Sequence, residues 1–514
     1  MIQTMLIRAF SLEGWKMSMS TFSVKRGLGE LTVLTEAQRK EIHERSLELL
    51  ETMGLKVFSD EALEILRRNG ANVDTNTKIA RMPRSLVEEG LRHCARPVKL
   101  GGRTPDMDFV LDLEHHFLCT DGVGTSVLDF KTGKRRAALL RDVEECARLI
   151  DSIPEIVAHT PMVTPSDVPA QAHTAYEFAA SVENTRKHIV SGGVYRKEEA
   201  EIEIEIAALI LGGREELRKR PLLSSINCVS SPMIVGKTIE PAIQYASAGV
   251  PPIIMTMPLV GASGPASIAG SILMGNAQVL GVNTIVQLAH PGAPVIYSSV
   301  PMSMDITTGS FGGALPPGNL VAAGHIQMAR YYRLPFFSGG HGSSSKVPDP
   351  QAAYEKALSA WTMFLAGADF LGGPGLLESF TVLSYEQLLI DVEAFKMMAS
   401  MLEGFPIDEE AFAVPLLRKV GHEGHFLGEK STVETLKKSW KPWLTDVTPY
   451  ASWAASGSKT ILDRAHKEAE RILASYRPEQ LSSDVQREIR EILKKTEDKT
   501  KKERMDQNIL LAGK

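Results

Sequence analysis

Three residues of this chain combine chemically useful side chains with glycine-rich loops. Asp305, His341 and Glu378 each lie in such a loop. Glycine allows the backbone to approach a ligand closely. A carboxylate can balance a positive charge, and a neutral imidazole can donate or accept a hydrogen bond near physiological pH. We therefore predict His341, Glu378 and Asp305 as the catalytic residues.

Further polar and aromatic side chains lie in or near the same loops. Aromatic faces, together with a carboxylate, are the usual partners of a quaternary ammonium group. The predicted substrate-binding residues are Tyr297, Phe311, Phe337, Lys346, Tyr354, Glu355 and Phe380. The alternative is that the aromatic residues belong to the core and the charged residues cap helices. Asp349 followed by Pro350 is typical of a helix start.

Each of these loops follows a short apolar run, and such runs recur at the spacing of one βα unit. The runs are 156–163, 188–194, 222–229, 252–257, 294–300, 334–338 and 369–372. Continuous apolar runs are typical of strands that are buried on both faces of a parallel sheet. Amphipathic segments such as 238–248 and 350–366 lie between them. The pattern predicts a TIM (β/α)8 barrel with one strand not identified, whose active site is built from the loops after the strands.

The rest of the chain flanks this barrel. Apolar residues at helical spacing predict helices over 35–53, 59–69 and 84–94, and the final segment is a charged helix that continues into a solvated tail. The predicted organisation is a flexible tail at 1–34, a helical layer at 35–150, the catalytic barrel at 151–420, a helical extension at 421–480, and a charged helix and tail at 481–514.

Composition excludes several classes of function. The chain has 514 residues, a net charge of −5 and 6% aromatic residues, which argues against nucleic acid as a partner. No apolar segment is long enough to indicate a membrane span. The four cysteines, Cys94, Cys119, Cys146 and Cys228, include no C-x-x-C pair. We interpret them as buried thiols of a reducing compartment, and we expect a cytoplasmic protein.

Several stretches together resemble the trimethylamine methyltransferase superfamily. They are GASGPASIAGSILMGNAQVLGVNTIVQLAHPGAPVIYSS at 261–299, PFFSGGHGSSSKVPDPQAAYEK at 335–356, GHEGHFLG at 421–428 and DFKTGKRRAALLRDVEECARLID at 129–151. A W-K-P-W-L stretch from Trp440 follows. The resemblance covers roughly residues 35–480, and the joint order of the stretches makes it more specific than any single motif.

This resemblance implies a TIM barrel that passes a methyl group from a small methylated amine to the cob(I)alamin of a separate corrinoid protein. No cofactor would be bound permanently, and we expect a homo-oligomer. Founding members carry pyrrolysine in a barrel loop, and the corresponding loop lies within Gly339–Ser345, where only standard residues occur. Relatives without pyrrolysine are similar to methyltransferases of glycine betaine and other quaternary amines, so this substrate class is expected here.

Two alternatives remain open. A divalent-metal lyase or aldolase would require two or three carboxylates or imidazoles within ligand distance at the barrel mouth. A catalytically silent barrel that binds betaines, or that scaffolds a corrinoid protein, would have the same fold. His422 and His425 lie among glycines in a pattern typical of a turn, so we predict no metal site.

Overall fold

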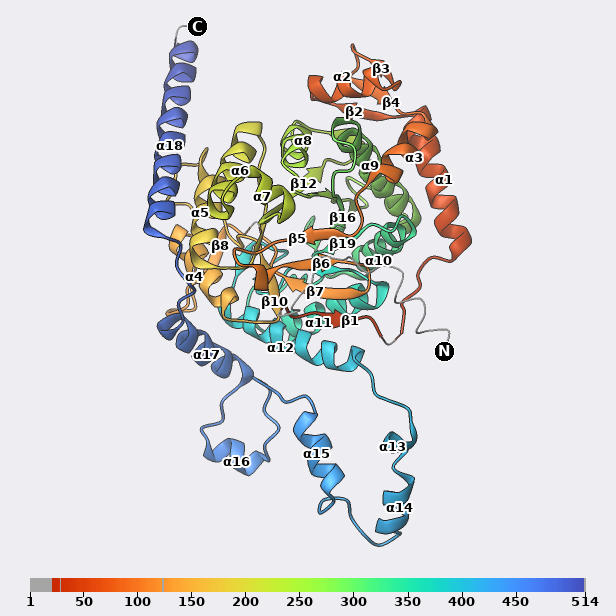
Figure 1. Cartoon of the computed structure of the whole chain (residues 1–514), viewed down its shortest axis with the longest axis vertical. Helices are drawn as coiled ribbons and strands as arrows, with labels where there is room; N and C mark the ends of the chain where they lie inside the picture. Colours follow the sequence, from red (N-terminus) through yellow and green to blue (C-terminus); the bar gives the residue numbers. More distant parts are fainter. Residues whose placement is uncertain (1–20, 28, 123, 513–514) are drawn as a thin grey trace.

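A closed barrel of eight parallel strands forms the centre of the computed structural model, which describes residues 21–27, 29–122 and 124–512 (Figure 1). Each strand pairs with the next along the chain, and the last pairs with the first. The strands are β7 (His115–Cys119), β10 (Ile156–His159), β11 (His188–Ser191), β12 (Leu223–Val229), β14 (Pro252–Thr256), β16 (Ile296–Ser299), β19 (Phe336–Ser338) and β20 (Phe370–Leu371). The chain therefore has the predicted TIM-barrel fold.

Seven of these strands lie in the apolar runs identified from the sequence, and the eighth is β7. β7 lies before residue 151, within the segment predicted as a helical layer, so the barrel begins earlier than the predicted boundary. It pairs in parallel with β10 and with β20. The short run HHFLC contains two histidines, which obscures its apolar character. Because β7 closes the barrel, the loop after it opens onto the same end as the other strand loops.

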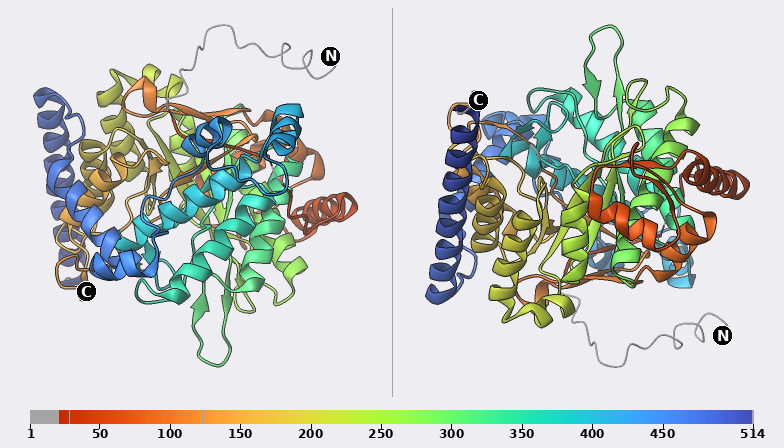
Figure 2. Two further views of the ribbon diagram at one scale, coloured as in Figure 1. Left: turned by 90° about the horizontal axis from the view of Figure 1, so that it is seen from below. Right: turned by 90° about the horizontal axis from the view of Figure 1, so that it is seen from above.

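Helices surround the barrel and cover the outward faces of its strands (Figure 2). Asp349 caps one of these helices, α11, as expected from the sequence. Its Oδ1 accepts the backbone N–H of Ala352 at 2.8 Å. The helices are α4 (Leu140–Asp151), α5 (His173–Asn184), α6 (Lys197–Leu211), α7 (Arg214–Lys219), α8 (Ile239–Ser247), α9 (Ile268–Ala289), α10 (Pro316–Tyr331), α11 (Pro350–Ala366) and α12 (Tyr385–Leu402).

α9 is the one helix in the described part of the chain with the length and apolar composition of a membrane span. In its most apolar window 83% of the residues are buried inside the protein. α9 packs against the N-terminal helices α1 (Glu36–Thr52) and α3 (Arg84–His93) and against α10. Its apolar surface is therefore covered by neighbouring helices.

The N-terminal segment contains the three predicted helices, which are α1, α2 (Asp60–Arg68) and α3. It also contains strands that were not predicted from the sequence. β2 (Leu55–Val57), β3 (Asn72–Asp74), β4 (Ile79–Arg81) and β13 (Ile234–Val235) form one small sheet. In the predicted flexible tail, β1 (Val24–Lys25) pairs with β7, whereas residues 1–20 lie outside the described residues. The layer is thus mixed rather than purely helical.

A hairpin closes the N-terminal end of the barrel. Its strands are β5 (Val98–Leu100) and β6 (Phe109–Leu111), which lie above β7 in the view of Figure 1. The Phe109 ring on β6 lies 5.0 Å from that of Phe117 and 5.6 Å from that of Phe370. These aromatic rings pack together at this end of the barrel, so we expect a ligand to enter from the opposite end.

The C-terminal segment has two parts with different surroundings. α13 (Glu409–Phe412), α14 (Val414–Val420), α15 (Lys430–Lys438) and α16 (Tyr450–Ala455) extend away from the barrel in Figure 1. α17 (Ile461–Ser475) and α18 (Ser483–Ala512) pack against it. Ile489 and Ile492 of α18 are buried against α5 and α6, so the predicted solvated helix is partly a core element.

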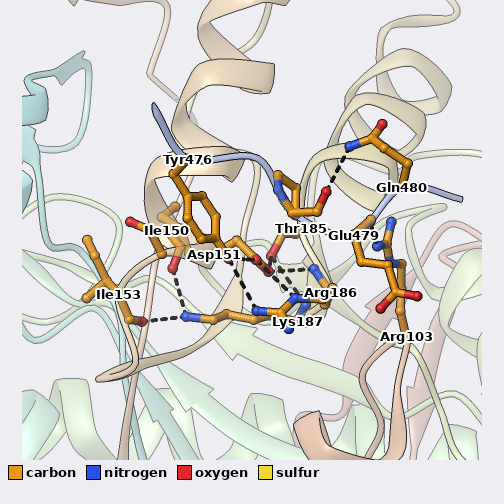
Figure 3. A network of polar contacts seen from close by, with 12 residues as sticks. Arg103, Ile150, Asp151, Ile153, Thr185, Arg186, Lys187, Tyr476, Glu479 and Gln480 are labelled. Atoms are coloured by element: carbon orange, nitrogen blue, oxygen red, sulfur yellow. Dashed lines mark hydrogen bonds and ion pairs between the residues drawn. The ribbon is translucent and has the colours of Figure 1, made fainter. Parts of the chain in front are cut away.

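A polar network fixes the connection between α17 and α18 (Figure 3). The buried carboxylate of Asp151 accepts hydrogen bonds from the Tyr476 hydroxyl at 2.5 Å, the Thr185 hydroxyl at 2.9 Å and the Arg186 backbone N–H at 2.6 Å. Beside it, the Lys187 ammonium donates to the backbone oxygens of Ile150 and Ile153, and burial lowers the pKa of Lys187 to about 7. Both carboxylate oxygens of Asp151 therefore accept hydrogen bonds, as a buried carboxylate requires.

Candidate active site at the barrel mouth

We call the C-terminal ends of the barrel strands, with the loops that follow them, the mouth. A row of inward-facing side chains lies beneath it. Residues in register on neighbouring parallel strands face the same side of the sheet. The pairings place Phe117, Cys228, Met255, Ser298, Phe337 and Phe370 in one such row. The rings of Phe337 and Phe370 lie 6.0 Å apart, as expected for side chains that meet inside the barrel. This row forms the floor of the mouth.

Glycines in the layer above leave space that Asp121 occupies. A Cβ added at Gly372 would lie 3.1 Å from both the Asp121 Cβ and the Phe337 ring. A Cβ added at Gly339 would lie 3.2 Å from Asp121 Oδ2, 3.3 Å from the tip of the Phe380 ring and 3.3 Å from Val300. One point beside Gly339 is therefore shared by a carboxylate oxygen, an aromatic ring and an aliphatic side chain.

Asp121 is an anion with no protein cation beside it. Its side chain is buried, and Oδ1 accepts the backbone N–H of Gly122 at 2.9 Å. Burial raises its pKa to about 6, and the Gly122 hydrogen bond offsets part of that effect. Within the described residues no lysine, arginine or histidine forms an ion pair with it. A buried carboxylate normally has a positive partner, so this site is suited to a cationic ligand.

The Phe380 ring is held by glycines from three different loops. Added Cβ atoms would lie 3.3 Å from the ring at Gly313, 3.3 Å at Gly339 and 3.1 Å at Gly373. Larger residues at these positions would displace the ring. The glycine-rich character of the loops, noted in the sequence, therefore serves to bring an aromatic side chain beside Asp121.

The loop that carries Phe380 has an unusual backbone. Glu378, Ser379 and Phe380 have φ values of 46°, 51° and 74°, in the left-handed region that residues other than glycine rarely adopt. They connect β21 (Leu376–Leu377) and β22 (Val382–Leu383), which join β8 (Ser126–Leu128) and β9 (Arg135–Ala137) in one sheet. Such strain persists only where surrounding contacts hold it, often at functional sites.

Glu378 supplies one of those contacts. Its Oε2 lies 2.6 Å from Nη1 of Arg135 on β9 and 2.9 Å from the Thr381 hydroxyl. Its backbone N–H donates to the Ser345 oxygen at 2.7 Å. About a third of the Glu378 side chain is exposed. Glu378 thus lies two residues before Phe380 in the same loop. Its ion pair with Arg135 joins this loop to β9.

The mouth is accessible to solvent. The inward-facing Cys228 and Met257 are both exposed, with their sulfur atoms 3.8 Å apart. This corrects the prediction that all four cysteines are buried, which holds for Cys94, Cys119 and Cys146. Burial and nearby Asp121 raise the pKa of Cys228 to about 11. The thiol is therefore recessed among protein atoms but still in contact with solvent.

His341 lies beneath the loops rather than on their surface. The side chain is fully buried, and its Nδ1 lies 3.2 Å from the Gly372 oxygen. Nε2 has no hydrogen-bond partner, and burial lowers the pKa of His341 to about 4, so the ring is neutral. The backbone oxygen of His341 accepts from Lys356 at 2.8 Å. Its backbone N and C atoms lie 3.3 Å from a Cβ added at Gly373, beside the Phe380 cradle.

Asp305 and Phe311 lie on a hairpin that projects from the mouth (Figure 2). β17 (Met302–Met304) and β18 (Phe311–Gly312) form it, and β17 pairs with β15 (Leu259–Val260). Asp305 is exposed and accepts the backbone N–H of Thr307 at 2.8 Å, which lowers the pKa of the carboxyl group. The structure does not bring Asp305 together with His341 or Glu378.

The remaining predicted binding residues lie in three different surroundings. Phe337 joins the floor of the mouth, and Glu355 organises the loop after β19 by accepting from the Ser343 hydroxyl and the Ser344 backbone N–H. Lys346 and Tyr354 are exposed, the latter on the outer surface of α11. Tyr297 is buried on the outward side of β16, with its hydroxyl 3.2 Å from Asn276 Oδ1.

Asp121 and Arg135 were not identified from the sequence, because β7 itself was not recognised. The stretch FLCTDGVG does show the pattern of the other barrel loops, with apolar residues followed by polar residues and glycine. No group of three His, Cys, Asp or Glu side chains in the described ranges is arranged to hold a metal ion. The metal-dependent lyase alternative therefore has no supporting cluster at the mouth.

A closed parallel barrel with a buried carboxylate and aromatic rings among the loops of its mouth has the architecture of a TIM-barrel enzyme. The sequence comparisons give the family. The profile of the trimethylamine methyltransferase (MTTB) family matches residues 11–501, and the chain belongs to this family.

Named relatives cover nearly the whole chain. A trimethylamine methyltransferase of Desulfitobacterium hafniense is 34% identical over 89% of this chain and 92% of its own length. A glycine betaine methyltransferase of the same species is 32% identical over 89% and 95%. A trimethylamine methyltransferase of Methanosarcina barkeri is 31% identical over 91% and 96%.

Similarity to solved structures is weaker. Dihydropteroate synthase of Thermus thermophilus matches with a TM-score of 0.35 and 14% identity, covering 60% of this chain and all of its own.

Proposed function

We propose that this protein transfers a methyl group from a small quaternary amine, of the glycine betaine type, to the corrinoid of a separate partner protein. The observation that carries the proposal is Asp121, a buried carboxylate without a protein cation, which faces the same point as Phe380 and Gly339. A trimethylammonium group that came from the mouth to lie beside Asp121 and Phe380 would meet a negative charge and an aromatic ring. These are the two partners that bind such groups.

The chemistry of the leaving group favours a quaternary substrate. In the reaction the carbon–nitrogen bond breaks and its electron pair stays on nitrogen, which leaves as a neutral tertiary amine. A tertiary amine would instead have to leave as an amide anion unless it were first made cationic. The loop within Gly339–Ser345 contains only standard residues, so it holds no pyrrolysine for such a step. A quaternary ammonium needs none.

The residues of this chain would bind and orient the substrate. The partner's corrinoid, in its cob(I)alamin state, supplies the nucleophile that accepts the methyl group. Asp121 would hold the cation, and Phe337, Phe380 and Val300 would exclude water from around the methyl groups.

Access for the partner is supported by the exposed side chains at the mouth. Cys228 and Met257 are solvent-exposed although they face inward. A large nucleophile must approach from this side, because the opposite end of the barrel is filled by Phe109 and its neighbours. The open mouth agrees with a docking partner rather than with an enclosed reaction.

The direct experiment is methyl transfer with purified protein and chemically reduced cob(I)alamin. Glycine betaine, other quaternary betaines and trimethylamine would be compared by the loss of cob(I)alamin absorbance. We expect transfer from at least one quaternary amine and none from trimethylamine. Transfer from trimethylamine alone would contradict the substrate class. Binding of a betaine without any transfer, in the presence of cob(I)alamin or a corrinoid protein, would favour the silent barrel.

A further inference from the structure

An extended arm leaves the barrel after α12 and exposes apolar side chains along its whole length. From Glu403 to Trp440, no residue whose side chain the structure describes is buried. Large apolar residues in this arm are nevertheless 40–78% exposed. They are Phe405, Ile407, Phe412, Val414, Leu417, Phe426, Leu427, Val433 and Leu436.

The arm cannot stabilise itself in this conformation. Its helices α13, α14 and α15 have four, seven and nine residues. Isolated helices shorter than about 12–15 residues are marginal in water. Helices in proteins gain most of their stability by burying an apolar face, and here no such face is covered. Another surface must therefore cover the arm.

The same chain also exposes an apolar face on the two barrel helices nearest the arm. On α11, Tyr354 and Leu358 are 57% and 62% exposed. On α12, Met397 and Met401 are 40% and 51% exposed. The spacing of four residues in each pair places both members on one side of their helix. We call this surface, defined by these four residues, the α11–α12 face. α11 and α12 pack side by side, with Tyr354 and Leu358 in the first half of α11 and Met397 and Met401 at the end of α12, just before Phe405 of the arm.

We propose that the arm of each molecule covers the α11–α12 face of a neighbouring copy of this chain. One molecule offers both halves of the contact, an uncovered apolar arm and an uncovered apolar face. Contacts between identical copies can then be reciprocal, which is the simplest closed arrangement. Apolar patches of this extent are rare on monomers and are typical of permanent interfaces.

The position of the arm argues against the methyl-accepting partner as its occupant. Helices of a βα barrel run back from the mouth, so α12 ends near the opposite end of the barrel. In Figure 2 the arm and the β17–β18 hairpin lie toward opposite ends of the molecule. The partner in methyl transfer must reach the mouth and cannot cover the arm at the same time.

The test is the mass of the purified full-length protein by light scattering, compared among three variants. We expect two copies, or a larger whole-number multiple, of the 56.2 kDa chain. Leu417→Asp with Leu427→Asp disrupts the arm, and Leu358→Asp with Met397→Asp disrupts the face. Each double variant should be monomeric at about micromolar concentration. The control is Ile306→Asp on the projecting hairpin, also a highly exposed apolar residue at 87%, which should leave the mass unchanged.

Mixing the two double variants separates the proposal from simple misfolding. A mixed pair contains one intact arm against one intact face, so it should associate although each variant alone does not. A monomeric wild-type protein would overturn the proposal. So would association of either double variant at the wild-type strength, or failure of folded variants to associate on mixing.

Discussion

Asp121 Oδ2 lies 3.2 Å from the position that a Cβ atom would occupy on Gly339. The two residues come from loops after β7 and β19, more than two hundred positions apart in the sequence. Because Gly339 has no side chain, the carboxylate, the Phe380 ring and Val300 can all lie close to its backbone. A methyl group placed there by mutation would press on Asp121, Phe380 and Val300, which line the site that we assign to the substrate cation.

Gly339→Ala should therefore weaken substrate use while keeping the fold. Gly339 does not have a positive φ, so alanine can adopt its backbone conformation. We expect kcat/KM for the quaternary amine to fall at least about tenfold, which corresponds to about 1.4 kcal/mol. The matched control is Gly340→Ala, whose added Cβ would meet Leu371 and Met363 at 3.2–3.4 Å instead. Equal losses in both variants would remove the cation site from this position.

The pH profile should follow the ionisation of Asp121. Its pKa is raised to about 6 by burial, so the carboxylate is charged above that pH and neutral below it. We expect kcat/KM to fall about tenfold per pH unit below pH 6, since this parameter reports the free enzyme. In Asp121→Asn the profile should be flat in this range and the activity low throughout. A wild-type profile that is flat from pH 5 to 8 would show that Asp121 does not hold the substrate.

The same residue should lower the stability of the folded protein. Because the folded-state pKa is raised above the ordinary value of 3.8, protonated Asp121 favours folding. That contribution is present below about pH 4 and is lost as the pH rises through about 6. Asp121→Asn should thus be more stable than wild type at pH 8, by up to about 3 kcal/mol. At pH 4 the two unfolding free energies should agree. Urea denaturation at the two pH values measures this, and a less stable variant at pH 8 would contradict it.

Phe380→Leu tests the aromatic contribution to cation binding. Cation–π contacts contribute about 0.5–2 kcal/mol, so affinity for a quaternary amine should fall about 2–30-fold. Binding of a neutral isostere, in which carbon replaces the ammonium nitrogen, should change less. The control is Phe336→Leu, a buried ring stacked on Tyr297 at 5.5 Å on the outward side of the barrel. That variant should lose thermal stability and keep its affinity, as calorimetry and melting curves would show.

Glu378→Gln and Arg135→Gln should behave alike. The two side chains form a 2.6 Å ion pair that supports the loop carrying Phe380. We expect each variant to lose about the same factor in kcat/KM, and the double variant to lose little more than either one. Melting temperatures should change little, because exposed pairs contribute about 0–1 kcal/mol. If Glu378→Gln alone abolishes transfer, Glu378 contacts the substrate itself, as the sequence suggested.

Much of the architecture could be predicted from the sequence because it depends on local apolar patterning. Seven strands of the barrel follow continuous apolar runs, and the helix start at Asp349 follows from its capping side chain. The family membership could also be recognised from the order of its motifs. β7 was missed because its two histidines interrupt the apolar pattern, although His116 is buried and bonded to the Ala368 backbone oxygen at 2.5 Å.

The candidate site depends on contacts that no local pattern encodes. The sequence by itself determined which loops carry glycine, charge and aromatic rings, because strand ends are marked by composition. Only the tertiary structure decided that Asp121, rather than Asp305, faces Gly339 and Phe380. Closure of the barrel brings the first strand beside the last, so the residues that meet at the mouth are set by strand register and loop path. The side of the sheet that a residue faces changes with each single step along a strand, which composition cannot specify.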